Sequence, residues 1–142
     1  MNQEYLNYAK RLEEIGDMII SGTETIKTPD SAIILTPKDC ALYKNELTVI
    51  IENVKYTRDV LEETKSPRIV QKEHKRLVEG LNQYIESIAT LRDSFKVTKD
   101  NEGELDRDQY DIGMNLQKEA VAEIGKASEL IGDILVSYLQ NN

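Results

Sequence analysis

The only histidine of the chain, His74, and its only cysteine, Cys40, are the side chains best suited to nucleophilic or metal chemistry. A di-metal site in a helical protein needs a Glu-x-x-His motif, but residue 71 is glutamine, and no second histidine or cysteine is present. Both residues fall on apolar helix faces, which favours a structural role. We therefore predict a buried Cys40 and a His74 that is hydrogen-bonded to the hydroxyl of Tyr8 or Tyr138, with no catalytic residue and no cofactor.

The segment from Thr98 to Gln109 resembles the calcium-binding loop of EF-hand proteins. Gly103 falls at the turn glycine, and carboxylates fall at three of the ligand positions (Asp100, Glu102 and Asp106). Thr98 replaces the first carboxylate, Gln109 replaces the bidentate glutamate at the end of the loop, and the chain has no second copy. We therefore expect a solvated acidic turn, with those three carboxylates as the candidate metal ligands.

A basic cluster lies between Lys65 and Arg76, where five basic residues face only Glu73 and give a net charge of +4. Arg68, Lys72 and Arg76 recur at four-residue steps, so like charges repel by about 0.2 to 0.5 kcal/mol per pair near the helix end that disfavours cations. Two interpretations are open: carboxylates elsewhere neutralise the cluster, or it docks an acidic partner. The partner-binding candidates are Arg68, Lys72, Lys75 and Arg76.

An apolar run, Ile33-Ile34-Leu35, stands in the connection between the first two expected helices. The first interpretation is that it folds back over the end of the helices, because three consecutive apolar residues are unusual in a solvated loop. The alternative is an exposed partner-binding patch.

Heptad-like apolar spacing predicts four helices, at about 2–27, 37–64, 67–96 and 107–140. The third carries an apolar seam from Val70 to Phe95, and Thr36-Pro37 and Ser66-Pro67 are helix-start signals. The last has a second apolar stripe that includes Leu116 and Leu130, which predicts that most of its surface is packed. The expected fold is a single all-α domain over residues 1–142, an antiparallel up-down four-helix bundle with long helices and short loops. In that fold the Ser66 turn and the acidic segment Lys99–Asp111, with a net charge of −4, lie at opposite ends, which would permit weak head-to-tail self-association.

The composition excludes several functions. The net charge of −8 disfavours direct nucleic-acid binding, and there is no phosphate-binding glycine loop, nucleophile motif, signal-peptide core or membrane-length apolar run. We expect a cytoplasmic protein, or an extracytoplasmic one if a signal segment has been removed. The expected function is non-enzymatic: a small acidic bacterial or mobile-element adaptor, inhibitor or regulator that binds another protein as a monomer or weak homo-oligomer. Two alternatives are an acidic nucleic-acid mimic that inhibits a DNA-binding protein and a calcium- or small-ligand-binding bundle.

Overall fold

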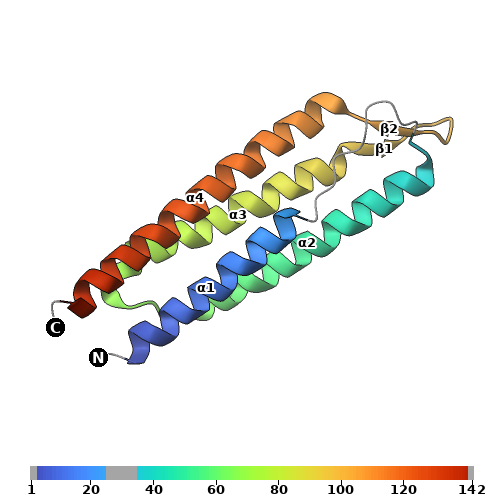
Figure 1. The fold of residues 1–142 in the computed structure, drawn as a ribbon. Helices are drawn as coiled ribbons and strands as arrows, with labels where there is room; N and C mark the ends of the chain where they lie inside the picture. Colours follow the sequence, from blue (N-terminus) through green and yellow to red (C-terminus); the bar gives the residue numbers. More distant parts are fainter. Residues whose placement is uncertain (1–2, 25–34, 141–142) are drawn as a thin grey trace.

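The computed structural model describes residues 3–24 and 35–140, and most of these residues are helical (Figure 1). The elements, in chain order, are α1 (Gln3–Glu24), α2 (Pro37–Glu63), the short 3₁₀ helix η1 (Arg68–Val70), α3 (Gln71–Asp93), the strands β1 (Phe95–Val97) and β2 (Gly103–Leu105), and α4 (Arg107–Gln140). The predicted all-α class is confirmed, apart from the small sheet. Within the described residues, none of the helices has the length and apolar character that a membrane crossing requires.

The start of α2 follows its sequence signal closely. Thr36 accepts a hydrogen bond through its side chain from the backbone N–H of Asp39 (3.1 Å), and Asp39 accepts one from the backbone N–H of Thr36 (3.0 Å). Pro37 occupies the first turn, where its missing N–H costs nothing. These hydrogen bonds lower the pKa of the Asp39 carboxyl, backbone N–H donation being the largest cause.

The predicted helix 67–96 is wrong at both ends. Pro67 is extended (ψ 143°), so the chain passes through η1 before α3 begins at Gln71, and no side chain caps either helix. At the other end α3 stops at Asp93, because the backbone carbonyl of Ser94 accepts a hydrogen bond from the N–H of Asp106 and the chain continues as a strand. Val70 and Phe95, the first and last seam residues, are still buried.

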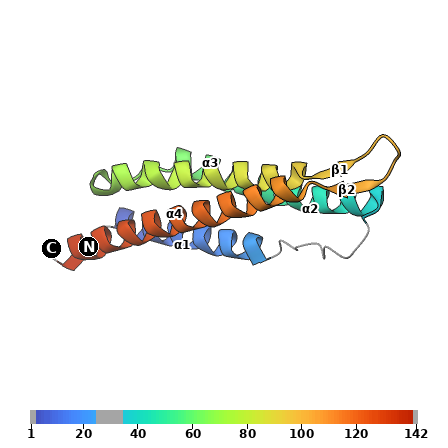
Figure 2. The same cartoon turned by 90° about the horizontal axis from the view of Figure 1, so that it is seen from above.

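The expected solvated turn after α3 is a β-hairpin instead. β1 and β2 pair antiparallel, with Phe95 opposite Leu105 and Val97 opposite Gly103. Asn101 has a positive φ of 60°, which asparagine tolerates better than most residues, and its N–H closes the turn onto the carbonyl of Thr98 (3.0 Å). The short connection therefore contains a structured hairpin that projects from one end of the molecule (Figures 1 and 2).

The helices lie lengthwise beside one another, and the chain turns back after α2 and again at the hairpin (Figure 1). α3 is central, because it packs against both α2 and α4, whereas α1 contacts α4 and α2 more sparsely. In both views α1 ends about midway along α2, so it accompanies only one half of the longer helices (Figures 1 and 2). The predicted α1 seam residues that the structure describes are all buried (Tyr5, Tyr8, Leu12, Ile15 and Ile19).

Two glycines allow α3 and α4 to approach closely. A Cβ on Gly80 would lie 2.9 Å from Cγ1 of Ile124, and one on Gly113 would lie 3.0 Å from the backbone N of Leu91. The second apolar stripe of α4 is only partly packed, contrary to the prediction, because Leu116 and Leu130 are 40% and 41% exposed. Ala120 and Ala127 of this stripe are buried and Ile134 packs against the core, whereas Leu116 and Leu130 face outward.

Candidate functional site

The basic cluster lies around the turn from α2 to α3, at the end of the molecule where α1 starts and α4 finishes (Figure 1). Lys65 is in the turn, Arg68 is in η1, and Lys72, Lys75 and Arg76 are in the first two turns of α3. The hairpin and its carboxylates lie at the opposite end (Figures 1 and 2). The most basic segment (65–76, net charge +4) and the most acidic segment (99–111, net charge −4) therefore lie at opposite ends of the molecule (Figure 1).

Arg76 is neutralised within the fold. Its Nε and Nη2 each lie 2.7 Å from Oε1 of Glu123 on α4. This charge-assisted hydrogen bond raises the pKa of the Arg76 guanidinium and lowers the pKa of the Glu123 carboxyl. For this one residue, neutralisation by a carboxylate is the correct interpretation of the basic stripe, and Arg76 has a structural role between α3 and α4.

The other four basic residues have no such partner among the residues that the structure describes. Lys65, Arg68, Lys72 and Lys75 are exposed, and within the described parts of the chain none forms an ion pair or a side-chain hydrogen bond. We call these four residues the basic end. Lys72 also lies in the first turn of α3, whose N-terminus lacks a capping side chain and carries the positive end of the helix dipole. The fold therefore keeps four cations together at an electrostatic cost.

A cavity of about 800 Å³ opens among these side chains. Residues from the start of α1, the end of α2, the connecting turn and α3 line it together. Three of the basic end contribute to it (Lys65, Arg68 and Lys75), as do two carboxylates (Glu4 and Glu62). His74 and Val78 form part of its wall. The three cations and two carboxylates of the lining give a net charge of +1, and part of the lining is apolar. Such a cavity is suited to a negatively charged side chain or chain terminus that contacts the cations.

His74 joins three helices at the wall of this cavity. A hydrogen bond of 2.6 Å joins the hydroxyl of Tyr8 on α1 to Nδ1 of His74, which confirms one of the two predicted partners. The backbone of Leu61 on α2 also hydrogen-bonds the ring. Burial is the larger effect and lowers the pKa of His74 below its ordinary value, and burial likewise raises the pKa of the Tyr8 hydroxyl. His74 is therefore a neutral structural residue that holds α1 against α2 and α3.

Acidification should weaken the fold through His74. Because the folded-state pKa lies below the ordinary value of 6.5, the unfolded chain takes up the proton more readily. The stabilising contribution is therefore present above pH 6.5 and is lost as the pH falls through the folded-state pKa. Urea unfolding at about pH 7.5 and about pH 5.5 should show a decrease in the free energy of unfolding that is smaller in His74→Gln. An equal decrease in both proteins would assign the effect to carboxylates instead.

No family model, curated protein or solved structure gives a significant match to this chain.

The candidate metal ligands of the hairpin have separate positions. Asp100 and Glu102 are exposed in the turn between β1 and β2. Asp106 caps α4: Oδ1 accepts a hydrogen bond from the backbone N–H of Gln109 (3.1 Å), and Oδ2 lies 3.2 Å from Nζ of Lys96. These contacts lower the pKa of the Asp106 carboxyl, the backbone hydrogen bond being the largest cause. In the described part of the chain, no group of three His, Cys, Asp or Glu side chains is placed to hold a metal ion.

Cys40 and the apolar run lie near the hairpin end. Cys40 is fully buried and its thiol donates to the backbone carbonyl of Lys96 (3.6 Å), which joins α2 to β1 and confirms its predicted packing role. Leu35 is buried, and its backbone lies against Gly103, as expected if the run folds back over the helix ends. Ile33 and Ile34 lie outside the described residues.

Sequence reasoning did not find the cavity. Its wall is assembled from residues more than 70 positions apart, from Glu4 to Val78, and no local spacing connects them. The pairing of Arg76 with Glu123, which is 47 residues away, could not be predicted from local sequence spacing either. The only local signal in the sequence was the concentration of basic residues after Pro67. It indicated where the candidate site lies, but it did not distinguish Arg76, which is paired with a carboxylate, from the other cations.

Proposed function

We propose that this chain is a non-enzymatic protein–protein interaction module whose basic end binds an acidic segment of another protein. The observation that supports this most strongly is a set of four exposed cations, Lys65, Arg68, Lys72 and Lys75. None of them is paired with a carboxylate of residues 3–24 or 35–140, whereas neighbouring Arg76 is paired. The proposal includes the finer architecture, an antiparallel up-down four-helix bundle, and the role of a small cytoplasmic adaptor, inhibitor or regulator of bacterial or mobile-element origin.

The charge distribution of the chain would both attract an acidic partner to the basic end and orient that partner as it docks. The whole chain carries −8 and residues 65–76 carry +4, so the rest of the chain carries a net −12 and on average repels an acidic partner. Complementary charge of this kind raises the association rate and selects the docking orientation more than it adds affinity. The cavity beside Arg68 and Lys75 would receive an acidic side chain or a carboxyl terminus from the docked segment.

A labelled oligoglutamate peptide tests the proposal directly. The triple variant Arg68→Glu, Lys72→Glu, Lys75→Glu should bind it about threefold to 150-fold more weakly, since each exposed charge contact contributes about 0.2 to 1 kcal/mol and three contribute about 0.6 to 3 kcal/mol. Fluorescence anisotropy measures this, at low salt and again at about 150 mM salt, where binding should weaken. The matched control reverses three exposed basic residues elsewhere (Lys10, Arg11 and Lys118) and should bind like the wild type.

Stability measurements on Lys72→Glu separate function from folding. Glutamate in the first turn of α3 complements the helix dipole and removes repulsion from the neighbouring cations, so unfolding should require about 0.3 to 1 kcal/mol more. A variant that is more stable but binds oligoglutamate less tightly indicates that the lysine is kept for binding. A loss of stability would instead give Lys72 a structural role and count against the proposal.

Head-to-tail association of copies would use the same charges, because the hairpin lies at the opposite end (Figure 1). Sedimentation velocity at low salt distinguishes this outcome. A monomer that binds oligoglutamate supports docking of a different protein, whereas oligomers abolished by the triple variant would assign the basic end to self-association.

A further inference from the structure

Three large apolar side chains form a row along the outside of α2. Leu42, Val49 and Tyr56 are 53%, 59% and 70% exposed, although they stand in the middle of a well-packed helix. Seven residues come to about 20° short of two full helical turns, so the three lie almost on one line, about 10 Å apart. The opposite face of α2 carries buried Leu47, Ile51 and Val54. The row therefore points away from the core, and we call it the outer row.

Carboxylates border the outer row on both sides. At 100° per residue, Glu46 and Glu52 lie about 60° from Val49 in opposite directions, and both are exposed. Glu46 makes no ion pair with the described residues, and Glu52 makes only a long contact of 3.8 Å with Lys55. Glu63 follows the row at the end of the helix, and Lys38 precedes it.

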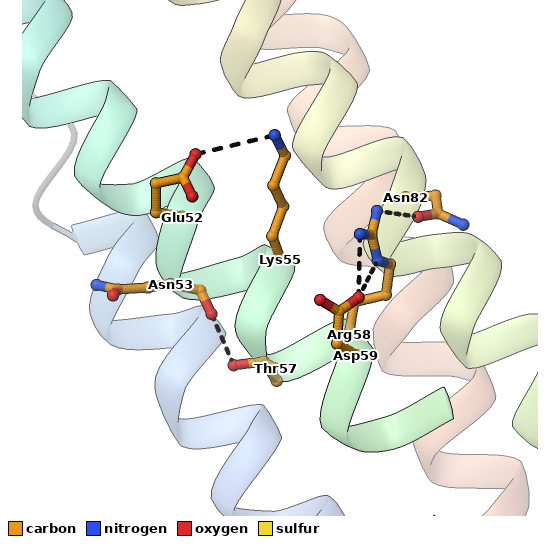
Figure 3. A network of polar contacts seen from close by, with 7 residues as sticks. All are labelled: Glu52, Asn53, Lys55, Thr57, Arg58, Asp59 and Asn82. Carbon is orange, nitrogen blue, oxygen red and sulfur yellow. Dashed lines mark hydrogen bonds and ion pairs between the residues drawn. The ribbon is translucent and has the colours of Figure 1, made fainter. Parts of the chain in front are cut away.

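The basic residues of α2 lie mostly away from the outer row. Arg58 donates from Nη1 to Oδ1 of Asn82 on α3 (2.9 Å) and contacts Asp59 through Nε and Nη2, as Figure 3 shows. Its guanidinium is thus directed toward α3. In the same view Lys55 reaches back toward Glu52. The electrostatic border of the row is therefore predominantly negative, apart from Lys38 at its start.

A second copy of α2 does not fit this border. In an antiparallel pair centred on Val49, Leu42 would meet Tyr56, but Glu46 would lie on the same side as Glu46 of the other copy, and Glu52 on the same side as its Glu52. In a parallel pair Glu46 would lie on the same side as Glu52 of the other copy. Like charges that flank the contact on both sides destabilise either arrangement, and the net charge of −8 adds to the repulsion.

We propose that the outer row of α2 binds a basic amphipathic helix of another protein. Apolar residues at seven-residue spacing match the geometry by which one helix packs its side chains between those of another. Lysine or arginine beside the partner's apolar stripe would complement Glu46 and Glu52. This surface is separate from the basic end and takes a partner of opposite charge, so the two sites would let one small protein join two different chains.

Titration of the ¹⁵N-labelled protein with a synthetic helix tests this inference. The peptide, of about 21 residues, carries leucine at every seventh position and lysine beside the leucines, which gives three heptads. A second peptide has the same composition in scrambled order. We expect amide shifts concentrated in residues 42–60 and at least fivefold weaker binding of the scrambled peptide. Equal binding of both peptides would reduce the interaction to net charge and overturn the proposal.

Variants of exposed residues complete the test. Leu42→Gln, Val49→Gln, Tyr56→Gln should weaken binding of the patterned peptide at least fivefold. The control variant, Ile112→Gln, Leu130→Gln, Val136→Gln, removes three comparably exposed residues from α4 and should bind normally. Val49→Gln alone provides a milder version if the triple variant loses helicity. Unchanged binding by these α2 variants, or a wild-type dimer that the α2 substitutions dissociate, would contradict the proposal.

Discussion

Leu81→Ala should lower the free energy of unfolding by about 2 to 5 kcal/mol, the range for a leucine deleted from a packed core. Leu81 is fully buried on α3, the helix that packs against both α2 and α4. The substitution removes apolar contacts and leaves space that the two flanking helices cannot easily fill. Urea or thermal unfolding followed by circular dichroism measures the change.

Leu116→Ala is the matched control, because it makes the same chemical change in another long helix. Leu116 is 40% exposed, and its replacement should change the stability by no more than about 0.5 kcal/mol. Similar decreases in the free energy of unfolding for both leucines would mean that Leu116 is packed, which would contradict its exposure in the structure.

Gly103→Ala should destabilise the protein by about 1 to 3 kcal/mol through overpacking. A Cβ at this position would lie 2.5 Å from the carbonyl oxygen of Leu35 and 2.7 Å from that of Thr36. These are backbone atoms at the start of α2, so the strand or the capped helix end must move. The backbone of Gly103 itself is not left-handed, and the requirement for glycine is therefore one of space.

Gly125→Ala should stabilise the protein, in contrast to Gly103→Ala. Apart from the neighbouring backbone of α4 itself, no atom of the described residues lies within 4 Å of a Cβ at Gly125, so alanine gains helix propensity of up to about 1 kcal/mol without a clash. Differential scanning calorimetry of both variants would show a lower melting temperature for Gly103→Ala and a higher one for Gly125→Ala. A stable Gly103→Ala protein would mean that Leu35 and Thr36 do not pack on the hairpin.

Helix positions and core faces were largely predictable because they depend on local signals. The Thr36-Pro37-Asp39 cap marks the start of α2, and three- and four-residue spacing identifies the buried residues of α1 and α2. Ser66-Pro67 looked like the same start signal. It failed because Pro67 adopts an extended backbone, which a two-residue pattern does not specify.

The hairpin and the cavity could not be predicted because they depend on contacts between distant residues. Phe95 continues the heptad seam, which predicts that it is helical. Its backbone pairs with Leu105 instead, and the backbone N–H of Asp106 donates a hydrogen bond to the carbonyl of Ser94 beside it. The acidic residues that suggested a calcium loop are divided between the hairpin turn and the cap of α4. In the basic cluster, charge alone did not indicate that Arg76 pairs with Glu123 on α4, or that the other four cations pair with no carboxylate in the described part of the chain.

His74 has a structural role. As the only histidine of the chain it is the side chain best suited to acid–base or metal chemistry, but its burial and its hydrogen bond to Tyr8 make it a link between helices. It lines the cavity whose margin carries Lys65, Arg68 and Lys75, so it supports the docking surface from within.

Mapping of the oligoglutamate contact by NMR tests the central proposal most directly. Addition of the peptide to ¹⁵N-labelled protein at low salt should shift amides in the range 62–78, around the basic end and its cavity, and leave the hairpin amides of 95–105 unchanged. The shifts should disappear in the Arg68→Glu, Lys72→Glu, Lys75→Glu variant while its remaining spectrum stays that of the folded protein. Shifts spread evenly over the helices, or none within 62–78, would contradict a docking site at the basic end.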